Sequence, residues 1–295
     1  MNPIFGIAIV HFGDPQATER CLESIDRDAS TVGRRVVVVD NSGDFPEELL
    51  PLGVERLDSA DNPGFGEGAN RGLRHLLECA APRWLLVLNH DVELDSGFLD
   101  GARDALERTD VGKCGVGAAA GPIYSSPDGK LWYAGGSVAY LAGTVRQSRS
   151  ARDASRPRQV GFLPGTAIAV RNEAFRQVGG FDPRIFLYNE DLDLCRRLSA
   201  KGFGLYFQPS MSCRHRLGQA TGSAQRSPLY LEHLTAGRFL PFSNRWYRAY
   251  LGVLHSPYVL LRCLAALHHG KEGGRARAAA LLRGHWRALK TIFSS

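Results

Sequence analysis

The sequence lacks several features that would mark a specialised class of protein. Its six cysteines are scattered and form no C-x-x-C pair, which excludes a zinc ribbon and, in a chain of 295 residues, a dense disulfide scaffold. It has no internal repeat and no Gly/Ser-rich linker. Hydrophobic residues make up 44% and charged residues 22%, close to the globular average, so extended disorder is excluded as well. We expect reduced thiols, a cytoplasmic location and one large folded domain with an appendage.

We expect no targeting segment and no membrane-spanning segment in this sequence. The first ten residues are apolar but carry no basic n-region, so they predict a strand and not a signal peptide. The most apolar later stretch covers 249–269. It is interrupted by His255, Pro257 and Arg262, and we therefore expect that it does not cross a bilayer.

Acidic residues are scarce at one end of the chain. Residues 241–295 contain nine Lys or Arg and one acid, Glu272, giving +8, so the formal charge of +6 leaves −2 for residues 1–240. A basic chain can bind nucleic acid. However, the basic excess lies in this one tail and residues 1–240 are slightly acidic, so we expect no nucleic-acid partner.

The first half of the chain alternates β-branched runs with helical stretches, which predicts a parallel sheet covered by helices. The expected strands are 4–10, 35–40, 54–57 and 84–88. The expected helices are 15–26, 66–79 and 96–107, the last after a Ser96 cap.

After residue 121 the pattern changes. We expect a hairpin over 131–145, a polar mobile loop over 146–158, strands at 162–170 and 204–208, and helices at 172–178 and 192–200. From residue 230 the chain is helical and basic. This predicts a domain over 1–230, with halves 1–121 and 122–230, and an appendage over 231–295.

Asp40 ends the clearest strand, which has four consecutive valines, and Asn41 follows it. Ligands of open α/β sheets bind outside the carboxyl ends of the strands, so the Asp40 carboxylate can accept hydrogen bonds from a ribose or a nucleobase. The alternative is an Asp-Asn-Ser turn in which this carboxylate caps the next segment.

The glycine-rich stretch 62–72 follows Asp40, whereas a dinucleotide fingerprint places its glycines before the ribose-binding acid. The order is therefore wrong for NAD. The stretch can still open a helix whose N-terminal amides face an anion. The alternative is a tight turn into a closely packed helix.

Two further positions carry residue types suited to a metal ion. Asn89-His90-Asp91 ends a buried strand, and one carboxylate is enough for a divalent cation that keeps water and phosphate oxygens as its other ligands. A turn cap is the alternative for Asp91. His215, in a strand-like C-R-H, can complete such a site as a neutral imidazole, or it is a solvated surface histidine.

Glu190, Asp191 and Asp193 lie within four positions at the start of a predicted helix. Favourable charge at a helix N-terminus explains one or two of them. A partly buried carboxylate with a raised pKa would instead suit a general base that removes a proton from a hydroxyl.

Taken together and in this order, the motifs resemble those of the family 2 inverting glycosyltransferases, in particular a bacterial rhamnosyltransferase-like branch. The resemblance covers about 4–222. The motifs are I-V-H-F, V-V-V-V-D-N-S, N-P-G-F-G-E-G-A-N-R-G, L-V-L-N-H-D-V, G-T-A-I-A-V-R-N-E-A-F, G-G-F-D-P-R-I-F-L-Y-N-E-D-L-D-L-C-R-R-L and C-R-H.

The resemblance implies the GT-A fold, a Rossmann-like and mostly parallel central sheet with flanking helices. It implies a nucleotide-diphospho-sugar donor carrying dTDP or UDP, and Mg²⁺ or Mn²⁺. By matching position, Asp191 corresponds to the catalytic base, and Glu190 corresponds to a residue that positions the base or the acceptor. Asp91 and His215 correspond to the metal ligands. The positions it implies for the donor are Val10, Asp40, Gly64, Phe65, Gly66 and Asn70, and the further substrate-binding candidates are Asn41, Asn89, His90, Gly165 and Thr166. Apart from the resemblance, Trp132 in the predicted hairpin can offer a surface that stacks on the sugar, or it is a buried aromatic residue.

The chain departs from the family pattern at three points. Asn89 replaces the first acid of the metal motif, and His90 is an unusual middle residue. Arg245-Trp246 resembles part of a motif of processive synthases, but the expected Gln is absent. We therefore expect transfer of one sugar per encounter.

These observations predict a metal-dependent inverting glycosyltransferase that moves rhamnose from dTDP-rhamnose to a hydroxyl of a cell-surface glycan or a polyprenyl-linked acceptor. The alternatives are a UDP-hexose or UDP-N-acetylhexosamine transferase of the same fold, and a sugar-nucleotide-binding module without catalysis. The Glu190-Asp191 pair and Asp91 disfavour the module, which needs no base.

The basic tail has two interpretations. Its cations alternate with apolar residues at partly helical spacing, so a helix there can lie on the inner face of an anionic cytoplasmic membrane. Alternatively, the helix packs on the protein or forms a homodimer interface. The cations are Arg275, Arg277, Arg283, Arg287 and Lys290, and the apolar residues include Leu281, Leu282, Trp286 and Leu289.

Overall fold

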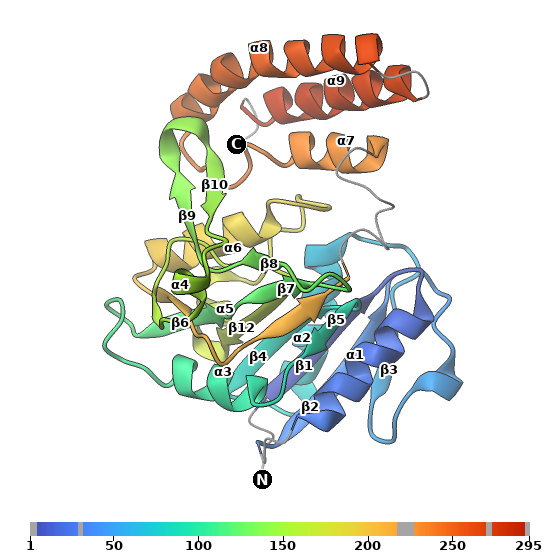
Figure 1. Ribbon diagram of the computed structural model, residues 1–295, viewed down its shortest axis with the longest axis vertical. Helices are drawn as coiled ribbons and strands as arrows, with labels where there is room; N and C mark the ends of the chain where they lie inside the picture. Colours follow the sequence, from blue (N-terminus) through green and yellow to red (C-terminus); the bar gives the residue numbers. More distant parts are fainter. Residues whose placement is uncertain (1–4, 29–31, 217–226, 270–272, 293–295) are drawn as a thin grey trace.

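The computed structural model describes residues 5–28, 32–216, 227–269 and 273–292. An eight-stranded sheet lies at its centre, in the order β11-β13-β6-β12-β4-β1-β2-β3 (Figure 1). The strands are β1 (Phe5–His11), β2 (Arg34–Asp40), β3 (Glu55–Asp58), β4 (Trp84–Asn89), β6 (Val116–Ala120), β11 (Arg158–Gln159), β12 (Ala167–Arg171) and β13 (Gly204–Phe207). Strands β3, β2, β1 and β4 are parallel, as are β6 and β13, whereas β12 runs antiparallel between β4 and β6. The predicted mixed α/β class with a mostly parallel sheet is confirmed.

Helices cover this sheet, which explains the uninterrupted apolar runs. Every residue of β1 and the four valines of β2 are buried, as expected for strands covered on both faces. Helix α1 (Pro15–Arg27) begins after Asp14, whose carboxylate accepts from the Ala17 N–H. Helix α2 (Phe65–Cys79) packs on β1 and β2, and α3 (Phe98–Leu106) packs on β6 and β12. The predicted Ser96 cap is wrong: the N-cap of α3 is Gly97, in the left-handed conformation.

A second sheet, in the order β5-β14-β7-β8, lies beside the first. Its strands are β5 (Val92–Leu94), β7 (Ile123–Ser125), β8 (Leu131–Tyr133) and β14 (Cys213–His215). Because β5 follows directly on β4 and pairs with β14, this sheet brings a segment from late in the chain to the end of β4.

Several expected boundaries in the second half are corrected. Strand β8 pairs with β7, and the hairpin is formed by β9 (Gly136–Ala139) and β10 (Thr144–Gln147), joined by the 3₁₀ turn η2 (Tyr140–Ala142). The strand expected at 162–170 begins only at Ala167, and the polar loop contains the short helix α4 (Ala151–Ala154). The remaining elements are η1 (Glu47–Leu49), α5 (Asn172–Val178) and α6 (Glu190–Ala200).

The C-terminal part is helical, as expected, and forms one end of the molecule (Figure 1). It consists of α7 (Pro228–Ala236), α8 (Arg245–His269) and α9 (Gly274–Lys290), with α9 packed against both α7 and α8. Phe239, Phe242 and Leu251 join the main hydrophobic core, so this part packs on the rest of the protein. Helix α8 runs unbroken through Pro257, and by length and composition alone residues 245–268 are long and apolar enough to cross a membrane.

Candidate active site

The carboxyl ends of three neighbouring strands place polar side chains at one edge of the main sheet. In the register of β1 and β2, His11 lies opposite Asp40, and in the register of β1 and β4, Val10 lies opposite Asn89. In open α/β sheets this is the edge where ligands bind.

Asp40 caps the turn that follows β2. Its Oδ1 accepts from the backbone N–H groups of Ser42 and Gly43, at 3.1 and 2.7 Å, and its Oδ2 accepts from the Phe45 N–H at 2.9 Å. The side chain is completely buried. The turn interpretation of Asp40 is therefore what the structure shows, and contact with a nucleoside stays a prediction.

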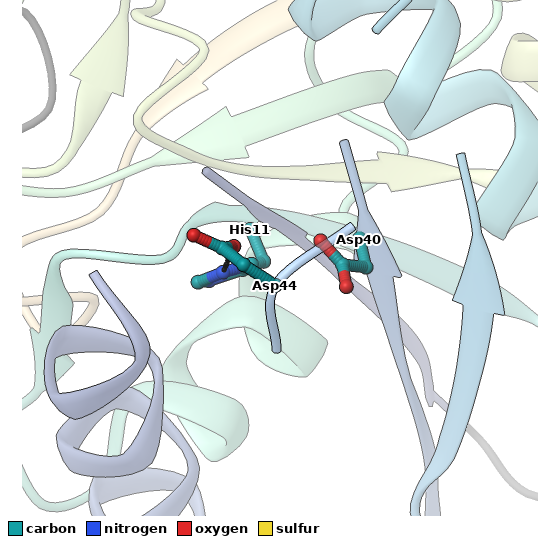
Figure 2. Close-up of side chains that lie close together, drawn as sticks. All are labelled: His11, Asp40 and Asp44. Carbon is teal, nitrogen blue, oxygen red and sulfur yellow. Dashed lines mark hydrogen bonds and ion pairs between the residues drawn. The ribbon is translucent and has the colours of Figure 1, made fainter. Parts of the chain in front are cut away.

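Beside this turn, His11, Asp40 and Asp44 offer one ligand atom each within 4.8 Å of one another, a spacing that could hold a metal ion (Figure 2). Hydrogen bonds already engage most of these atoms. His11 Nδ1 lies 2.7 Å from the Thr18 hydroxyl, and its Nε2 lies 3.0 Å from Asp44 Oδ1. Because Asp40 also accepts three amide hydrogen bonds, this set has little donor capacity left for a cation.

A second donor set lies at the end of β4. Asp91 and His215 are both buried, and His215 Nε2 lies 3.0 Å from Asp91 Oδ1 and 3.5 Å from Asn89 Nδ2. Within the described chain, Asp91 Oδ1 has no well-aligned hydrogen bond and His215 Nδ1 has none. With Nδ1 of His215 free, this buried pair suits a divalent cation better than the first set does, in which both ring nitrogens of His11 are engaged.

The charges around Asp91 favour its ionised form. Burial by itself would raise the pKa of Asp91, but the interactions with His215 and His90 outweigh burial and hold that pKa below its usual value. Burial lowers the pKa of His90, whose ring lies edge-on to His11, 5.6 Å away. Trp132, expected near the sugar, packs its ring edge-on against His215 at 6.1 Å. The structure therefore brings these predicted residues together.

The acidic cluster opens helix α6. The two residues before it, Tyr188 and Asn189, have φ of +64° and +72°, a left-handed backbone that asparagine tolerates but that is uncommon for tyrosine. Asp191 Oδ2 accepts from the Gly165 N–H at 3.2 Å, and its Oδ1 accepts from the Leu192 N–H at 2.8 Å. Glu190 is only 6% exposed, and its Oε2 has no hydrogen-bond partner among the described residues.

Burial governs the protonation of this pair. It raises the pKa of Asp191 to about 6, against the amide hydrogen bonds that lower it. Burial and the charge of Asp191 raise the pKa of Glu190 to about 8. The two carboxyls titrate as a pair, so near neutral pH they hold about one proton between them. The third acid, Asp193, pairs with Arg197 one turn along the helix.

A short chain of contacts joins the two groups of acids. Gly165, which donates to Asp191, is followed by Thr166, whose carbonyl accepts from the Asn89 N–H at 2.9 Å. Asn89 in turn lies beside His215 and precedes Asp91 by two residues. Asp91 and Asp191 are therefore at the same edge of the sheet, although they are a hundred residues apart in the sequence.

The glycine-rich turn supports the loop ahead of Asp191. Gly64 has φ of +92°, and a Cβ there would lie 2.1 Å from the carbonyl oxygen of Phe186. The Phe65 N–H donates to that same carbonyl at 3.0 Å, and Gly66 packs against Phe181 and Glu190. The first amide of α2 thus faces the loop, as the tight-turn interpretation predicts, and anion binding by the other amides of this helix start stays a prediction.

Asparagine side chains reinforce the same turn. Asn41 Nδ2 donates to the Gly64 carbonyl at 3.1 Å. Asn70 donates to the Phe181 carbonyl and accepts from the Phe181 N–H, both at 2.9 Å, so its amide links α2 to the loop and is not directed at a ligand. Val10, also expected near the substrate, has its side chain in the core.

The sequence did not single out His11 and Asp44 as partners in one network. The signal was weak, because Asp44 lies in an irregular turn after Asp40 and no spacing rule connects it to the end of the first strand.

Comparison with known proteins identifies the class to which this fold and site belong. The model of "Glycosyl transferase family group 2" matches residues 84–292, and the chain belongs to this family. It is therefore a glycosyltransferase of the GT-A fold.

The chain is also similar to individual proteins. The chain is 31% identical, over 91% of each chain, to N-acetylglucosaminyl-diphospho-decaprenol L-rhamnosyltransferase of Mycobacterium tuberculosis (strain ATCC 25618 / H37Rv). Among solved structures it resembles the mannosyltransferase PcManGT from Pyrobaculum calidifontis in complex with GDP-Man and Mn²⁺, with a TM-score of 0.57, 16% identity, and coverage of 98% of this chain and 88% of that one. GalNAc-T7 with UDP, GalNAc and Mn²⁺ gives a TM-score of 0.58, 14% identity, and coverage of 99% and 58%. These structural neighbours establish the fold.

Proposed function

We propose that this enzyme transfers one rhamnosyl residue from dTDP-rhamnose, with inversion and with the help of a divalent cation, to a hydroxyl of an N-acetylglucosaminyl-diphospho-polyprenol. The name of the mycobacterial relative supports the sugar and the acceptor. The observation that carries the chemistry is the placement of Asp191, held by the Gly165 amide, at the same edge of the sheet as Asp91 and His215.

Asp191 is the general base in this proposal. Its side chain keeps partial exposure while Glu190 beside it is buried, so Asp191 is the member of the pair that can reach an acceptor. The acceptor oxygen forms a bond to the anomeric carbon as its proton passes to Asp191. The bond from that carbon to the nucleoside diphosphate breaks on the opposite face, which inverts the configuration. One displacement needs no enzyme nucleophile.

Glu190 is a positioning residue. Its raised pKa keeps it protonated at neutral pH, so it adds no second negative charge beside Asp191. The pair therefore has one ionised carboxylate, Asp191, which can act as a base, and one buried neutral acid, Glu190.

Asp91 and His215 would hold the divalent cation, with Asn89 beside them. Nδ1 of His215 has no hydrogen-bond partner among the described residues, whereas both ring nitrogens of His11 are engaged, and this supports the assignment over the His11, Asp40 and Asp44 set. When bound, Mg²⁺ or Mn²⁺ supplies positive charge that stabilises the leaving diphosphate. Both structural neighbours were solved with Mn²⁺.

The substrate-binding roles of Asp40, Asn41, His90, Trp132 and Thr166 belong to the same proposal. Among these, His90 Nε2 and Asn41 Oδ1 are buried polar atoms without hydrogen-bond partners in the described chain, which supports their use by a ligand. All six cysteines are free thiols, and this supports a reducing, cytoplasmic compartment.

The direct test presents purified enzyme with a short-chain prenyl-diphospho-N-acetylglucosamine and Mn²⁺, and offers dTDP-rhamnose, UDP-glucose, UDP-N-acetylglucosamine and GDP-mannose separately. We expect a disaccharide only from dTDP-rhamnose, with loss of product on chelation and inverted anomeric configuration by NMR. Product formed only from a UDP-sugar would show that the donor is that UDP-sugar and not dTDP-rhamnose. Donor binding without turnover on any acceptor would indicate a binding module.

A further inference from the structure

Helix α8 exposes a long apolar face to solvent. Nine large hydrophobic side chains on it are 43–77% exposed. At about 100° per residue they all fall on one half of the helix. They are Trp246, Tyr250, Val253, Leu254, Tyr258, Leu260, Leu261, Leu264 and Leu267. A contiguous exposed apolar face of this length marks an interaction surface.

The opposite face of α8 is packed against protein. Leu251, Val259 and Cys263 are buried, and Cys263 Sγ contacts the Ala278 carbonyl of α9 at 3.6 Å. Polar contacts secure the same face: Arg248 donates to the Thr291 carbonyl, and His255 Nε2 lies 2.8 Å from the Ala142 carbonyl. A helix fixed to protein along one side has only its other side available for lipid, so its length and composition do not make it a span here.

The formal charge on helices α8 and α9 has one sign. Helix α8 contains three arginines and α9 contains four arginines and a lysine, and neither contains Asp or Glu. Arg245 lies over the Trp246 ring and Arg262 over the Tyr258 ring, at 5.2 and 5.8 Å. Tryptophan, tyrosine and arginine at the border of an apolar surface are typical of the interface of a bilayer.

Only some cations of α9 contribute to this surface. Arg283 and Arg287 pair with Glu232 of α7, so they serve the packing of the helices. Lys290 lies 5.4 Å from the Trp286 ring, and Trp286 is 62% exposed. The sequence pointed to α9 as the membrane helix, whereas the exposed apolar face belongs mainly to α8.

The apolar face continues onto the catalytic part of the protein. At the tip of the β9–β10 hairpin Leu141 is 83% exposed, and its carbonyl accepts from the Tyr250 hydroxyl at 3.0 Å. Helix α7, on the other side of α9, contacts the loop before the catalytic pair: the Phe186 ring stacks on His233 at 4.5 Å, and Asn189 donates to the Leu234 carbonyl. In Figure 1, α8 is the outermost helix at this end.

We propose that the exposed face of α8, with the hairpin tip at Leu141, docks in the plane of an anionic lipid bilayer and holds the enzyme on the surface that supplies its acceptor. An anionic surface is the occupant that matches a face rich in leucine and aromatic residues, bordered by cations and without acids. The statement that the bilayer supplies the acceptor rests on the proposed function. Docking on lipid does not rest on it, because docking needs no sugar.

Flotation of the full chain with vesicles, in the absence of donor and acceptor, tests the docking. The probes are phosphatidylcholine vesicles with about 30% phosphatidylglycerol and vesicles of phosphatidylcholine alone, a difference that reports on the electrostatic part of binding. We expect the wild type to float with the anionic vesicles and to bind the neutral ones at least about fivefold more weakly.

Leu261→Glu and Leu264→Glu introduce charge into the centre of the face, and each is expected to reduce vesicle binding about tenfold or more. The matched control is Leu52→Glu, which adds the same charge at a fully exposed leucine of the catalytic part and should float like the wild type. Because all three leucines are exposed, each variant should keep the wild-type Tm.

Sedimentation velocity without vesicles separates lipid from a second copy of the chain. A dimer that Leu261→Glu converts to monomer, with no flotation of the wild type, would overturn the proposal and make α8 a protein interface. Equal flotation of the wild type and Leu261→Glu would also overturn it. Rhamnosyl transfer to a water-soluble acceptor is measured in parallel, so a failure of docking is distinguished from a failure of the proposed activity.

Discussion

Asp191 accepts a hydrogen bond from the backbone N–H of Gly165, at 3.2 Å. This contact fixes a carboxylate from the start of α6 to the segment that leads into β12, and β12 is the direct neighbour of β4. Since Asp91 follows β4, the same contact sets where the base lies relative to the metal ligands. The position of Asp191 relative to Asp91 is therefore set through neighbouring strands of the central sheet.

Asp191→Asn tests the base. We expect the rate of sugar transfer to fall about 10²–10⁴-fold, because a positioned general base contributes an acceleration of that size. Donor binding, measured by thermal shift, should be unchanged. The control is Asp100→Asn, which removes a surface ion pair with Arg103 and should leave the rate unchanged. Full activity of Asp191→Asn would assign the base elsewhere.

Glu190→Gln tests whether the carboxyl of Glu190 is protonated in the folded protein. The pKa of Glu190 is about 8 in the folded protein and near 4.5 in an unfolded chain, so between these pH values the folded state holds a proton that the unfolded state releases. Its contribution to stability is complete below pH 4.5 and is lost as the pH rises through about 8. Glutamine does not titrate, so the variant should match the wild type at pH 5.

At pH 8.5 the Tm of Glu190→Gln should exceed that of the wild type by a few degrees, since about 1 kcal/mol shifts the Tm of a protein near this size by about 2–4 °C. Thermal denaturation at the two pH values measures this difference. Glu173→Gln, on the exposed start of α5, is the control and should follow the wild type at both. A Tm difference that is the same at pH 5 and pH 8.5 would contradict the raised pKa.

Asp91→Asn and Asp44→Asn distinguish the two donor sets. Mn²⁺ with dTDP should stabilise the wild type by about 2.7 kcal/mol at a ligand concentration a hundred times the Kd, and this appears as a rise in Tm. We expect Asp91→Asn to lose the Mn²⁺-dependent part of that rise and Asp44→Asn to keep it. The reverse pattern would place the cation at His11, Asp40 and Asp44.

Gly64→Ala tests the support of the catalytic loop. The new Cβ would meet the Phe186 carbonyl oxygen at 2.1 Å, so the loop before Glu190 has to move. A displacement of about 1 Å at a reacting group can cost about a hundredfold in rate, and we expect a loss of that order.

Gly53→Ala is the control for backbone strain alone, since Gly53 also has positive φ (+83°) but no atom lies within 4 Å of its added Cβ. It should lower the Tm by a few degrees, corresponding to about 1 kcal/mol, and keep the activity. Equal effects of the two variants would mean that strain, and not the contact with Phe186, explains the result at Gly64.

The sequence by itself determined the elements and the residue types of the site. Runs such as R-V-V-V-V-D need burial on both faces, so the parallel sheet follows from composition and periodicity. The ends of these strands placed Asp40, Asn89 and Asp91 at one edge. The expected boundaries failed mainly where a short strand pairs with a segment that the sequence did not mark as a strand, as β8 does with β7.

The tertiary structure decided what each of these groups does. The sequence left open whether Asp40 caps a turn, and the amides of Ser42, Gly43 and Phe45 show that it does, while its contact with a ligand stays a prediction. Burial, a property of the packed chain, raises the pKa values of Glu190 and Asp191. Packing of α9 between α7 and α8 likewise turned the apolar side of α8 outward. The preference of a segment for helix, strand or turn depends on neighbouring residues. Burial and charge pairing depend on contacts between residues far apart in the chain.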